Sequence, residues 1–307
     1  MHKLSIIIPH FNYPKSLRKL LETIIREAVE AQIIVVDDNS TKGIEDYQAL
    51  IRDFSDKVEF YTNDTGNKGA GAARNVGLSK AEGEWLLFAD ADDYLLEGWY
   101  EAVKGYTDKE YDIVYFVPTS VEEGSSKEGT RHKHYEELIE QYISSDASKN
   151  AAVDLKYLSV IPVSKLIRAS VVRDNDVRFD EIRNYDDAMF SVMTAFYAKE
   201  ISADTKHIYC IVEHPGSLTT DKKEDTYELG HLVFCRRNKF LREHLNKDEY
   251  DRYKIQMGAY GRLVEALRRK CGLVRFMKYL DMYRKYKVPI IGIMSYLAVR
   301  KLKSNER

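Results

Sequence analysis

The chain has 307 residues, of which 44% are hydrophobic and 31% charged, and a net charge of −2. This composition is ordinary for a soluble globular protein that holds one large α/β domain with an appendage, or two modest domains. Its three cysteines, Cys210, Cys235 and Cys271, are far apart and show no CxxC spacing, which excludes a zinc site and a disulfide framework. The N-terminal apolar run is too short for a signal peptide, and no run reaches the ~18–20 apolar residues of a membrane-spanning helix, so we expect a cytoplasmic protein.

The first 118 residues alternate short buried strands with amphipathic helices. Continuous apolar runs predict the strands, and apolar residues at helical spacing predict the helices between them. Strands joined by single helices indicate an α/β fold with a parallel sheet and right-handed crossovers. The expected strands are residues 4–9, 32–36, 58–62, 85–89 and 112–117, and the expected helices are residues 17–28, 44–54, 72–81 and 99–106.

The alternating pattern ends after Pro118. Residues 122–131 are rich in Gly, Ser, Glu and Lys, which predicts a mobile loop. The segment that follows mixes patterns and gives no clear topology, and from Tyr227 onward the sequence is helical and increasingly basic. We therefore expect three parts, residues 1–118, 119–220 and 221–307, of which the last is a helical, basic extension.

Polar side chains follow three of the predicted strands at the points where these strands end. The clusters are Pro9–Asn12, Asp37–Ser40 and Asp90–Asp93. Because open parallel sheets bind ligands at the carboxyl ends of their strands, we expect the three clusters to converge on one crevice.

The acidic cluster Asp90, Asp92 and Asp93 is the sharpest of these signals. Hard divalent cations prefer carboxylate oxygens and keep waters or phosphate oxygens in their coordination shell. Two carboxylates at D-x-D spacing on a tight turn reach one ion, and a nucleotide diphosphate supplies further ligands. The alternative is a solvated acidic turn in which Asp93 caps the next helix. The position directly after a buried strand favours the metal site.

Two other segments have both a functional and a structural interpretation. Asp37 and Asp38 either accept hydrogen bonds from a nucleotide base or ribose, or belong to an ordinary turn and helix cap. Gly69–Asn75 opens a helix whose N-terminus favours anions, with Arg74 suited to pair with phosphate or carboxylate, or it is a junction of small packing residues. This segment lacks the third glycine of the dinucleotide fingerprint and the GK[ST] of a P-loop, which argues against dehydrogenases and NTPases.

In their order along the chain, the segments IIIPHFN, IIVVDDNST, GAGAARNVGL and GEWLLFADADD resemble the bacterial family 2 glycosyltransferases of the GT-A fold. The similarity runs from about Leu4 to Tyr94. It implies a Rossmann-like, mostly parallel sheet flanked by helices, and an inverting transfer from a nucleotide-sugar, expected to be a UDP-sugar. It also implies Mn²⁺ or Mg²⁺ as cofactor, held by Asp92 with help from Asp90. The donor-binding residues that it implies are Pro9, Phe11, Asn12, Asp37, Asp38, Arg74, Asn75, Asp90 and Ala91.

The resemblance continues more weakly downstream, where Lys165–Arg168, Val177–Glu181 and Tyr185–Phe190 are similar to the family's acceptor segment. It implies that Asp187 is the general base, with Asp186 beside it at a position where the family usually has Glu. The shorter side chain leaves the role of Asp186 open. A carboxylate that caps the following helix is the alternative interpretation of Asp187.

His214 begins the segment HPGSLT, which resembles a later family stretch that approaches the diphosphate. It is implied to ligate the metal or donate to phosphate, and the alternative is an ordinary loop residue. By the same resemblance, residues 1–118 bind the nucleotide-sugar and residues 119–220 bind the acceptor. The expected acceptor is a glycan or a lipid-linked molecule in bacterial cell-surface polysaccharide synthesis, and no nucleic-acid partner is expected.

Two other functions are compatible with parts of this pattern. A sugar nucleotidyltransferase also uses an α/β fold, a metal and a nucleotide, but it usually places a Gly-rich loop with Arg or Lys after the first strand, where this chain has PHFN. A non-catalytic sugar-binding or scaffold protein on the same fold is the second alternative, against which the intact acidic motifs argue.

The C-terminal part concentrates positive charge, with 13 Lys and Arg against three acids in residues 262–307. Apolar residues at helical spacing accompany these cations, and residues 288–299 are mostly apolar. One interpretation is a helix that packs on the catalytic domain or forms a homodimer contact. The other is a peripheral helix in the interface of an anionic membrane, on its cytoplasmic face. The apolar residues in question are Leu273, Phe276, Met277, Leu280 and Tyr283.

Overall fold

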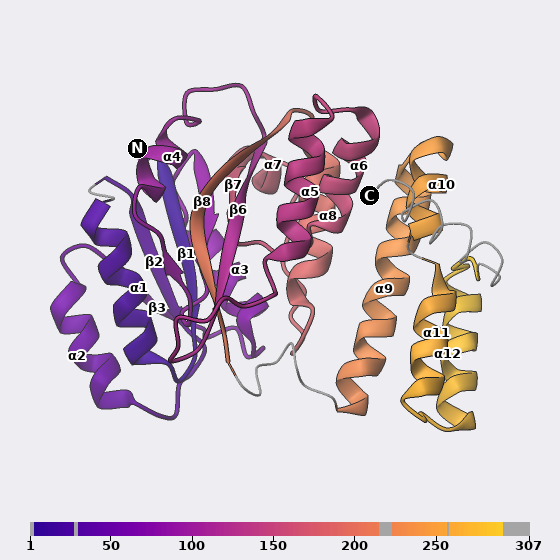
Figure 1. The fold of residues 1–307 in the computed structure, drawn as a ribbon. Coiled ribbons are helices and arrows are strands. Elements are labelled where there is room, and N and C mark those ends of the chain that lie inside the picture. The colour runs from indigo at the N-terminus through magenta and orange to yellow at the C-terminus, as the bar shows by residue number, and fades with distance from the viewer. Residues whose placement is uncertain (1–2, 28–29, 215–222, 257, 291–307) are drawn as a thin grey trace. The chain divides into compact units, whose positions relative to one another are not determined.

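The computed structural model describes residues 3–27, 30–214, 223–256 and 258–290 (Figure 1). The chain divides into two compact units, Met1–Ser217 and Leu218–Arg307. Each unit has its own cluster of buried side chains. The predicted boundary at residue 118, inside the first unit, stays a prediction.

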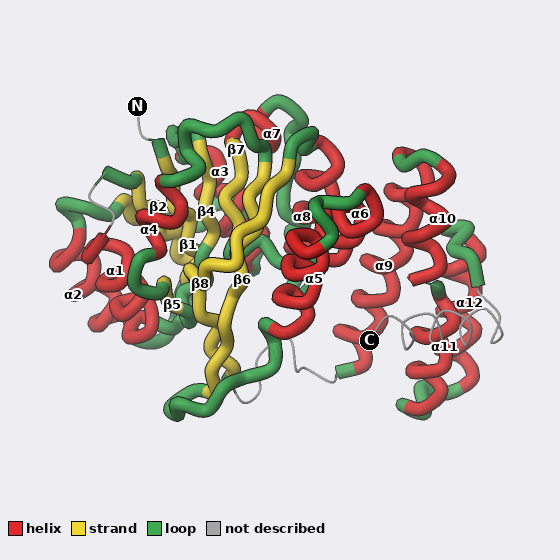
Figure 2. Tube along the Cα trace, turned by 45° about the horizontal axis from the view of Figure 1, so that its top comes forward, coloured by secondary structure: helices red, strands yellow, loops and turns green. Residues whose placement is uncertain are grey.

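The first unit is built on one eight-stranded sheet (Figure 2). Its strands are β1 (Leu4–His10), β2 (Gln32–Asp37), β3 (Glu59–Thr62), β4 (Trp85–Phe88), β5 (Tyr94–Leu95), β6 (Ile113–Glu122), β7 (Lys165–Arg168) and β8 (Ile201–Glu213). Their order across the sheet is β3-β2-β1-β4-β7-β6-β8-β5. The pairs β1–β2, β2–β3, β1–β4 and β6–β8 are parallel. β7 runs antiparallel to both β4 and β6, and β5 runs antiparallel to β8.

All five predicted strands are present, as β1, β2, β3, β4 and β6, and β6 continues beyond the predicted end to Glu122. The sequence prediction misses the other three strands for different reasons. β5 has only two residues and β7 only four, which is too short for a periodic signal. β8 begins with half-buried and exposed residues, so its apolar pattern is confined to its second half.

Eight helices accompany the strands in the described part of this unit. They are α1 (Pro14–Glu27), α2 (Ile44–Phe54), α3 (Ala70–Lys80), α4 (Trp99–Lys104), α5 (Lys133–Ser144), α6 (Lys149–Leu158), α7 (Ala169–Arg173) and α8 (Asp186–Tyr197). Figure 1 shows α1 and α2 on one side of the sheet and α5, α6 and α8 on the other. The helices predicted before residue 118 correspond to α1–α4.

The alternation of side chains along β1 explains why both faces of the sheet are covered. Ile6 and Ile8 belong to the buried cluster that includes α1, whereas Ile7 points to the opposite face, as successive residues of a strand do. On that face Gly77 brings α3 close to the sheet, because an added Cβ there would lie 2.5 Å from Ile7 Cγ2. The two faces together bury β1 completely, which fixes the strand ends that carry the polar clusters.

The segment after β6, predicted as a mobile loop, forms a hydrogen-bonded turn. The Glu122 N–H donates to Lys127 O at 3.0 Å, and the Gly129 N–H donates to Ser120 O at 2.8 Å. In Figure 2 the paired ends of β6 and β8 extend together and carry this turn. Its Gly- and Ser-rich composition therefore reflects a tight reversal of the chain.

The second unit is helical, as predicted. Its helices are α9 (Glu224–His244), α10 (Lys247–Gln256), α11 (Ala259–Arg268) and α12 (Leu273–Lys285). The facing sides of α9, α11 and α12 enclose a core of apolar and aromatic side chains that includes Phe234, Leu263 and Tyr279. No helix of the residues described in either unit is long and apolar enough to cross a membrane.

The apolar stripe predicted on the last helix is divided between the core and the surface. Phe276, Leu280 and Tyr283 pack into the core of the second unit. Leu273 and Met277 are 74% and 60% exposed, and the neighbouring Val274 is 84% exposed. A small helical unit needs its own hydrophobic core, and the apolar residues on the inner side of α12 are buried in that core. Most of residues 288–299 lies outside the described residues.

Candidate active site

The loops after β1 and β2 are joined by Asn12. Its backbone N–H donates to Ser40 Oγ at 2.8 Å, and its Oδ1 accepts from the N–H groups of Thr41 and Lys42 at 2.7 and 2.8 Å. Asn12 has a φ of 62°, in the left-handed region that Asn tolerates better than most residues. Two of the predicted clusters therefore meet, and the Asn12 amide oxygen braces the two loops.

Asp37 has its hydrogen-bond partners within the protein. Its Oδ1 lies 2.8 Å from His10 Nδ1 and 2.5 Å from Ser40 Oγ, and its Oδ2 accepts from the Ser40 N–H at 2.9 Å. Burial favours the neutral acid, but the hydrogen bonds from His10 and Ser40 outweigh burial and lower the pKa of Asp37. Asp37 therefore stays ionised and orders the ends of β1 and β2.

Asp38 connects the end of β2 to the loop that precedes α3. Its Oδ1 accepts from Asn63 Nδ2 and its Oδ2 from the Gly69 N–H, each at 2.7 Å. Beside this carboxylate lies a cavity of about 330 Å³, within the size range of small-ligand pockets. The cavity is lined by Asn39, Asn63, Asp64, Gly66, Asn67 and Lys68.

Arg74, on α3, links two acidic segments that are far apart in the sequence. Its Nη2 lies 2.5 Å from Asp90 Oδ1 and its Nη1 lies 2.6 Å from Asp186 Oδ2. The Arg74 side chain is only 6% exposed. Burial disfavours its charge, but Asp90, Asp186 and Asp187 outweigh burial and raise the pKa of Arg74. The guanidinium thus fixes the acidic turn after β4 next to the start of α8.

The first turns of α3 lie directly against residues 179–186. An added Cβ at Gly71 would lie 2.2 Å from Asp180 O and 2.9 Å from Asp186 Cβ, so only glycine permits this approach. Asn75 Nδ2 donates to Phe179 O at 3.0 Å, and the Phe179 N–H donates to Asn75 Oδ1 at 2.9 Å. Asn75, predicted to bind the donor, thus holds the backbone of Phe179, in the segment predicted to bind the acceptor.

The turn that contains Asp90, Asp92 and Asp93 is fixed by β8. The Tyr209 hydroxyl accepts from the Asp90 N–H at 2.8 Å and donates to Asp93 Oδ2 at 2.7 Å. Asp93 Oδ1 accepts from the Val212 N–H at 2.7 Å. Burial and the charges of Asp92 and Asp90 raise the pKa of Asp93 well above its usual range. Asp93 does not cap α4, whose N-cap is Gly98.

Asp92 points from this turn toward His214, which follows β8. Asp92 Oδ2 lies 3.3 Å from His214 Nε2, and His214 Nδ1 lies 2.9 Å from Glu123 Oε2. Burial and the charge of Asp90 raise the pKa of Asp92, while His214 opposes this shift. His214 Nε2 is buried and has no hydrogen-bond partner among the described residues.

Asp92 Oδ2 and His214 Nε2 are suited to supply some of the ligands of a cation. No group of three or more His, Cys, Asp or Glu side chains in the described parts of the chain has the arrangement of a complete metal site. Mg²⁺ sites are commonly completed by substrate phosphates and water, so two protein ligands suffice. Asp92 Oδ2 fits that requirement, and His214 Nε2, which has no hydrogen-bond partner in the described part of the chain, lies 3.3 Å away as a candidate second ligand. Asp90 Oδ1 already accepts a hydrogen bond from Arg74, so Oδ2 is the Asp90 oxygen better placed to bind a cation.

Asp187 lies in the first turn of α8, beside Asp186. Burial and the charge of Asp186 raise the pKa of Asp187 from 3.8 to about 7, while Arg74 opposes this shift. Burial also raises the pKa of Asp186, against the effect of Arg74. A carboxyl group with a pKa near neutrality is suited to proton transfer at physiological pH.

The remaining predicted donor residues differ in exposure. Pro9 and Ala91 are buried, so any contact with a ligand would come from their backbone atoms. Phe11 is 49% exposed, and Tyr13, which is not among the predicted site residues, is 51% exposed. The Tyr13 ring lies 6.0 Å from that of His214, measured between centroids. Two aromatic side chains are therefore exposed next to the polar clusters.

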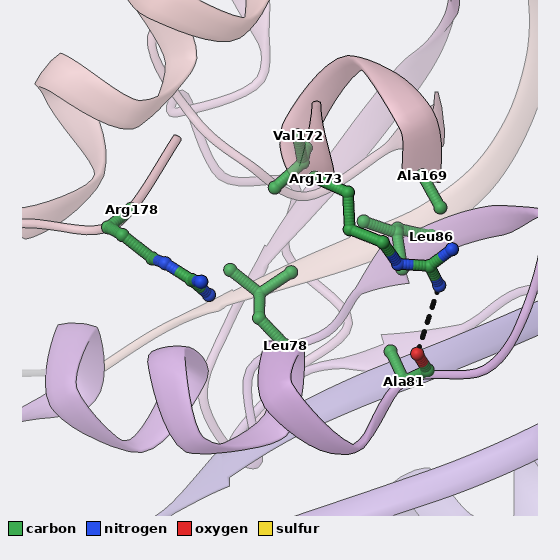
Figure 3. Close-up of a pocket in the computed structure, with 7 residues that line it drawn as sticks. All are labelled: Leu78, Ala81, Leu86, Ala169, Val172, Arg173 and Arg178. Carbon is green, nitrogen blue, oxygen red and sulfur yellow. Dashed lines mark hydrogen bonds between the residues drawn. The ribbon is translucent and has the colours of Figure 1, made fainter. Parts of the chain in front are cut away.

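A second, much smaller cavity lies away from this site. Figure 3 shows it between Leu78 on α3 and Val172 on α7, with Arg173 donating from Nη2 to Ala81 O at 3.0 Å. Its volume of about 20 Å³ is enough for a water molecule only.

Comparison with known proteins identifies the family. The profile of the family "Glycosyl transferase family 2" matches residues 5–175, which is more than half of the chain. The chain belongs to this family. The match spans both the strand-end clusters and the β7 region, and it favours a glycosyltransferase over a nucleotidyltransferase.

Among curated proteins, the chain is similar to poly(ribitol-phosphate) beta-N-acetylglucosaminyltransferase TarS of Staphylococcus aureus. The two are 25% identical over 268 residues, which are 84% of this chain but 43% of TarS. The chain thus spans less than half the length of this relative.

Solved structures confirm the fold. S. aureus TarS 1–349 in complex with UDP-GlcNAc superposes with a TM-score of 0.68 at 22% identity, covering 94% of this chain and 82% of that one. The mannosyltransferase PcManGT from Pyrobaculum calidifontis, in complex with GDP-Man and Mn²⁺, gives a TM-score of 0.57 at 14% identity, over 93% and 82% of the two chains. The GT-A fold predicted from the sequence is confirmed.

The sequence predicts no role for Tyr209 and Glu123, which order the site, nor for the buried side chain of Lys165. Tyr209 lies in the undetected strand β8, and Glu123 lies in the segment interpreted as a mobile loop. Lys165 is buried, with its Nζ 2.6 Å from Ser159 O and 5.0 Å from the centroid of the Tyr115 ring. Only Lys165 has a usable sequence signal, because a lysine that opens a short apolar run such as KLI is a candidate for a buried cation.

Proposed function

We propose that this protein is an inverting glycosyltransferase that moves a sugar from a UDP-sugar to a hydroxyl group of a glycan or lipid-linked acceptor. The observation that carries the proposal is the Arg74 bridge. It ties Asp90, in the acidic turn, to Asp186, the neighbour of Asp187, at 2.5 and 2.6 Å. A donor-side acidic turn and an acceptor-side carboxylate are thereby part of one site, as a direct displacement between two substrates requires.

Asp187 is proposed as the general base. The acceptor hydroxyl gives its proton to the Asp187 carboxylate while its oxygen bonds to the anomeric carbon of the donor. The bond from that carbon to the diphosphate oxygen breaks, and its electron pair leaves with UDP. Attack from the face opposite the leaving group inverts the anomeric configuration. The pKa of about 7 for Asp187 suits a group that takes up a proton at neutral pH.

Asp92 and His214 are proposed to hold a divalent cation, Mn²⁺ or Mg²⁺, with Asp90 nearby. A bound cation would neutralise the charge that develops on the departing diphosphate. The separation of 3.3 Å between Asp92 Oδ2 and His214 Nε2 supports this assignment, as does the Mn²⁺ in the structure of PcManGT. The cavity beside Asp38 is proposed to take the base and ribose of the donor, and Phe11 and Pro9 are proposed to contact the donor from the loop after β1.

The acceptor is proposed to be a cell-surface polymer or its lipid-linked precursor, at the cytoplasmic side of the membrane. TarS, whose name gives poly(ribitol-phosphate) as its acceptor, supports an anionic polymer. The second unit, Leu218–Arg307, has 22 Lys and Arg against 11 Asp and Glu, which is a net charge of +11. The first unit then carries 25 Lys and Arg against 38 Asp and Glu, a net charge of −13. An anionic acceptor or membrane surface would be attracted to the second unit.

Contact with an anionic membrane is proposed for the exposed apolar residues at the start of α12. Replacing Val274 and Met277 by Glu should abolish sedimentation with anionic vesicles, because apolar insertion is lost and charge is added. Ile44→Glu, at an apolar residue of the first unit that is 41% exposed, is the matched control. If both variants sediment like the wild type, this surface is a packing or homodimer contact.

The test of the central proposal is a screen of nucleotide-sugars, with MnCl₂ and with chelator, for release of the nucleotide. We expect UDP release from at least one UDP-sugar, dependent on the metal. Asp187→Asn should lower the rate by ~10²–10⁴-fold, the usual effect of losing a positioned base. Pyrophosphate release from a nucleoside triphosphate would indicate a nucleotidyltransferase. Donor binding without turnover by any acceptor or water would indicate a non-catalytic protein.

A further inference from the structure

Glu123 is placed beside His214 by the backbone of the sheet. β6 and β8 are parallel, and their register pairs Glu122 with Glu213. Glu123 and His214 directly follow the ends of these two strands, and the Glu123 N–H donates to Glu213 O at 3.0 Å. The approach of the Glu123 carboxylate to the His214 ring therefore depends on strand pairing as well as on a side-chain rotamer.

The turn after β6 holds this arrangement from its other end. Glu213 Oε1 accepts from the N–H groups of Thr130 and Arg131 at 2.6 and 2.8 Å. An added Cβ at Gly129 would lie 2.2 Å from Glu213 Oε1, so the turn closes tightly over the end of β8. The hydrogen bonds to Thr130 and Arg131 lower the pKa of Glu213 against the effect of burial. The Glu213 carboxylate is thus engaged by the turn, and the carboxylate next to Nδ1 of His214 is that of Glu123.

The His214 ring has two differently placed nitrogens. Nδ1 lies 2.9 Å from Glu123 Oε2, a distance at which an Nδ1–H donates to the carboxylate. In the neutral ring, Nε2 then carries the lone pair. His214 Nε2 lies 3.3 Å from Asp92 Oδ2, and the His214 side chain is only 10% exposed. Nε2 has no hydrogen-bond partner among the residues that the structure describes. Two electron-rich atoms this close repel each other unless a positive charge lies against both.

We infer that Glu123 is a positioning residue that holds His214 in the tautomer whose Nε2 faces a divalent cation shared with Asp92. The inference rests on the proposed function, because it assigns a supporting side chain to the metal site proposed there. Metal-ligating histidines usually donate their second ring N–H to a carboxylate or carbonyl, which orients the ring and raises its basicity. Glu123 supplies such a carboxylate and does not itself touch the cation.

The experiment is a titration of the full chain with MnCl₂ in the presence of UDP, followed by electron paramagnetic resonance of free Mn²⁺. Glu123→Ala should weaken Mn²⁺ binding by ~10–100-fold, the usual effect of losing such a partner. Glu123→Gln keeps an acceptor for Nδ1–H but not the charge, so its loss should be smaller. Glu122→Ala removes the neighbouring carboxylate, which pairs with Lys127 at 2.5 Å and not with His214, and should leave Mn²⁺ affinity unchanged.

The outcomes separate this inference from the metal proposal. If the wild type binds Mn²⁺ and Glu123→Ala binds it equally well, Glu123 has no positioning role, although the metal site stands. If the wild type binds no Mn²⁺ with UDP present, both the metal proposal and the inference are wrong. Because Glu123 is 53% exposed, its variants should unfold at the wild-type temperature. A fall in that temperature that matches the loss of affinity would show a structural role and overturn the inference.

Discussion

Arg74 Nη1 lies 2.6 Å from Asp186 Oδ2, although the two residues are separated by 112 positions in the sequence. The same guanidinium contacts Asp90 Oδ1. The bridge joins the segment predicted to bind the donor to the segment predicted to bind the acceptor. A single planar cation with a fork of donors thus orders both sides of the proposed reaction.

Replacing Arg74 by Ala should destabilise the fold and reduce turnover together. The substitution leaves the carboxylates of Asp186 and Asp90 without their cation, and breaking a buried pair costs on the order of 3 kcal/mol. Chemical denaturation measures this effect. Arg18→Ala is the control, because Arg18 pairs with Asp53 at the surface, with side chains 36% and 52% exposed, and such pairs contribute ~0–1 kcal/mol. Equal stability of the two variants would contradict the role given to Arg74.

The rate of transfer should rise with pH through a value of about 7, the pKa of Asp187. The base acts only as the carboxylate, so the rate falls when the pH drops below this value. A pH profile of kcat/KM for UDP release measures this dependence. Asp186→Asn removes a negative neighbour that raises the pKa of Asp187, so its profile should shift to lower pH. A profile flat between about pH 5 and 8 would contradict the assignment.

Asp187→Asn should make the protein more stable above neutral pH. Because the pKa of Asp187 is raised from 3.8 to about 7 in the folded protein, the folded state binds a proton more tightly than the unfolded chain between these values. Stability is therefore lost as the pH rises through this window. The variant should melt at least ~2–4 °C higher at pH 8, the shift expected for 1 kcal/mol. Below about pH 3, where both states of the wild type are mostly protonated at this position, the difference should become small.

Tyr209→Phe should loosen the acidic turn. It removes the hydroxyl that accepts from the Asp90 N–H and donates to Asp93 Oδ2. Leaving such buried groups unsatisfied costs about 1–3 kcal/mol, which denaturation will show. Tyr106→Phe also removes one hydroxyl contact, to Asp204 at 3.0 Å, but in a half-exposed place, and should cost less. The account of the turn is wrong if Tyr106→Phe is the more harmful change.

The strand and helix pattern before residue 118 was predictable because β1, β2 and β4 are buried on every residue. Their continuous apolar runs leave little ambiguity. β7 could not be predicted, since its four residues run antiparallel between β4 and β6, and no local pattern encodes an insertion from a distant segment.

Candidate residues for the site could be named from the sequence, and their roles stay predictions, but the side chains that hydrogen-bond to them could not be predicted. Asp92, Asp187 and His214 stand in segments whose chemistry is visible in the sequence. Their partners, such as Glu123 for His214 and Tyr209 for the acidic turn, depend on the pairing of β8 with β6 and β5. Asn75 was predicted to bind the donor, yet its side chain forms hydrogen bonds with the backbone of Phe179.

The most direct test of the central claim compares wild type and Asp187→Asn in two measurements on the same samples, UDP binding by calorimetry and metal-dependent UDP release from the best UDP-sugar. The account predicts equal UDP affinity and a rate lower by ~10²–10⁴-fold in the variant. Asp186→Asn should keep a measurable rate, because Asp186 is the partner of Arg74 and not the proposed base. An Asp187→Asn variant that releases UDP at the wild-type rate, or an inactive Asp186→Asn beside an active Asp187→Asn, would contradict the assignment of Asp187 as the base.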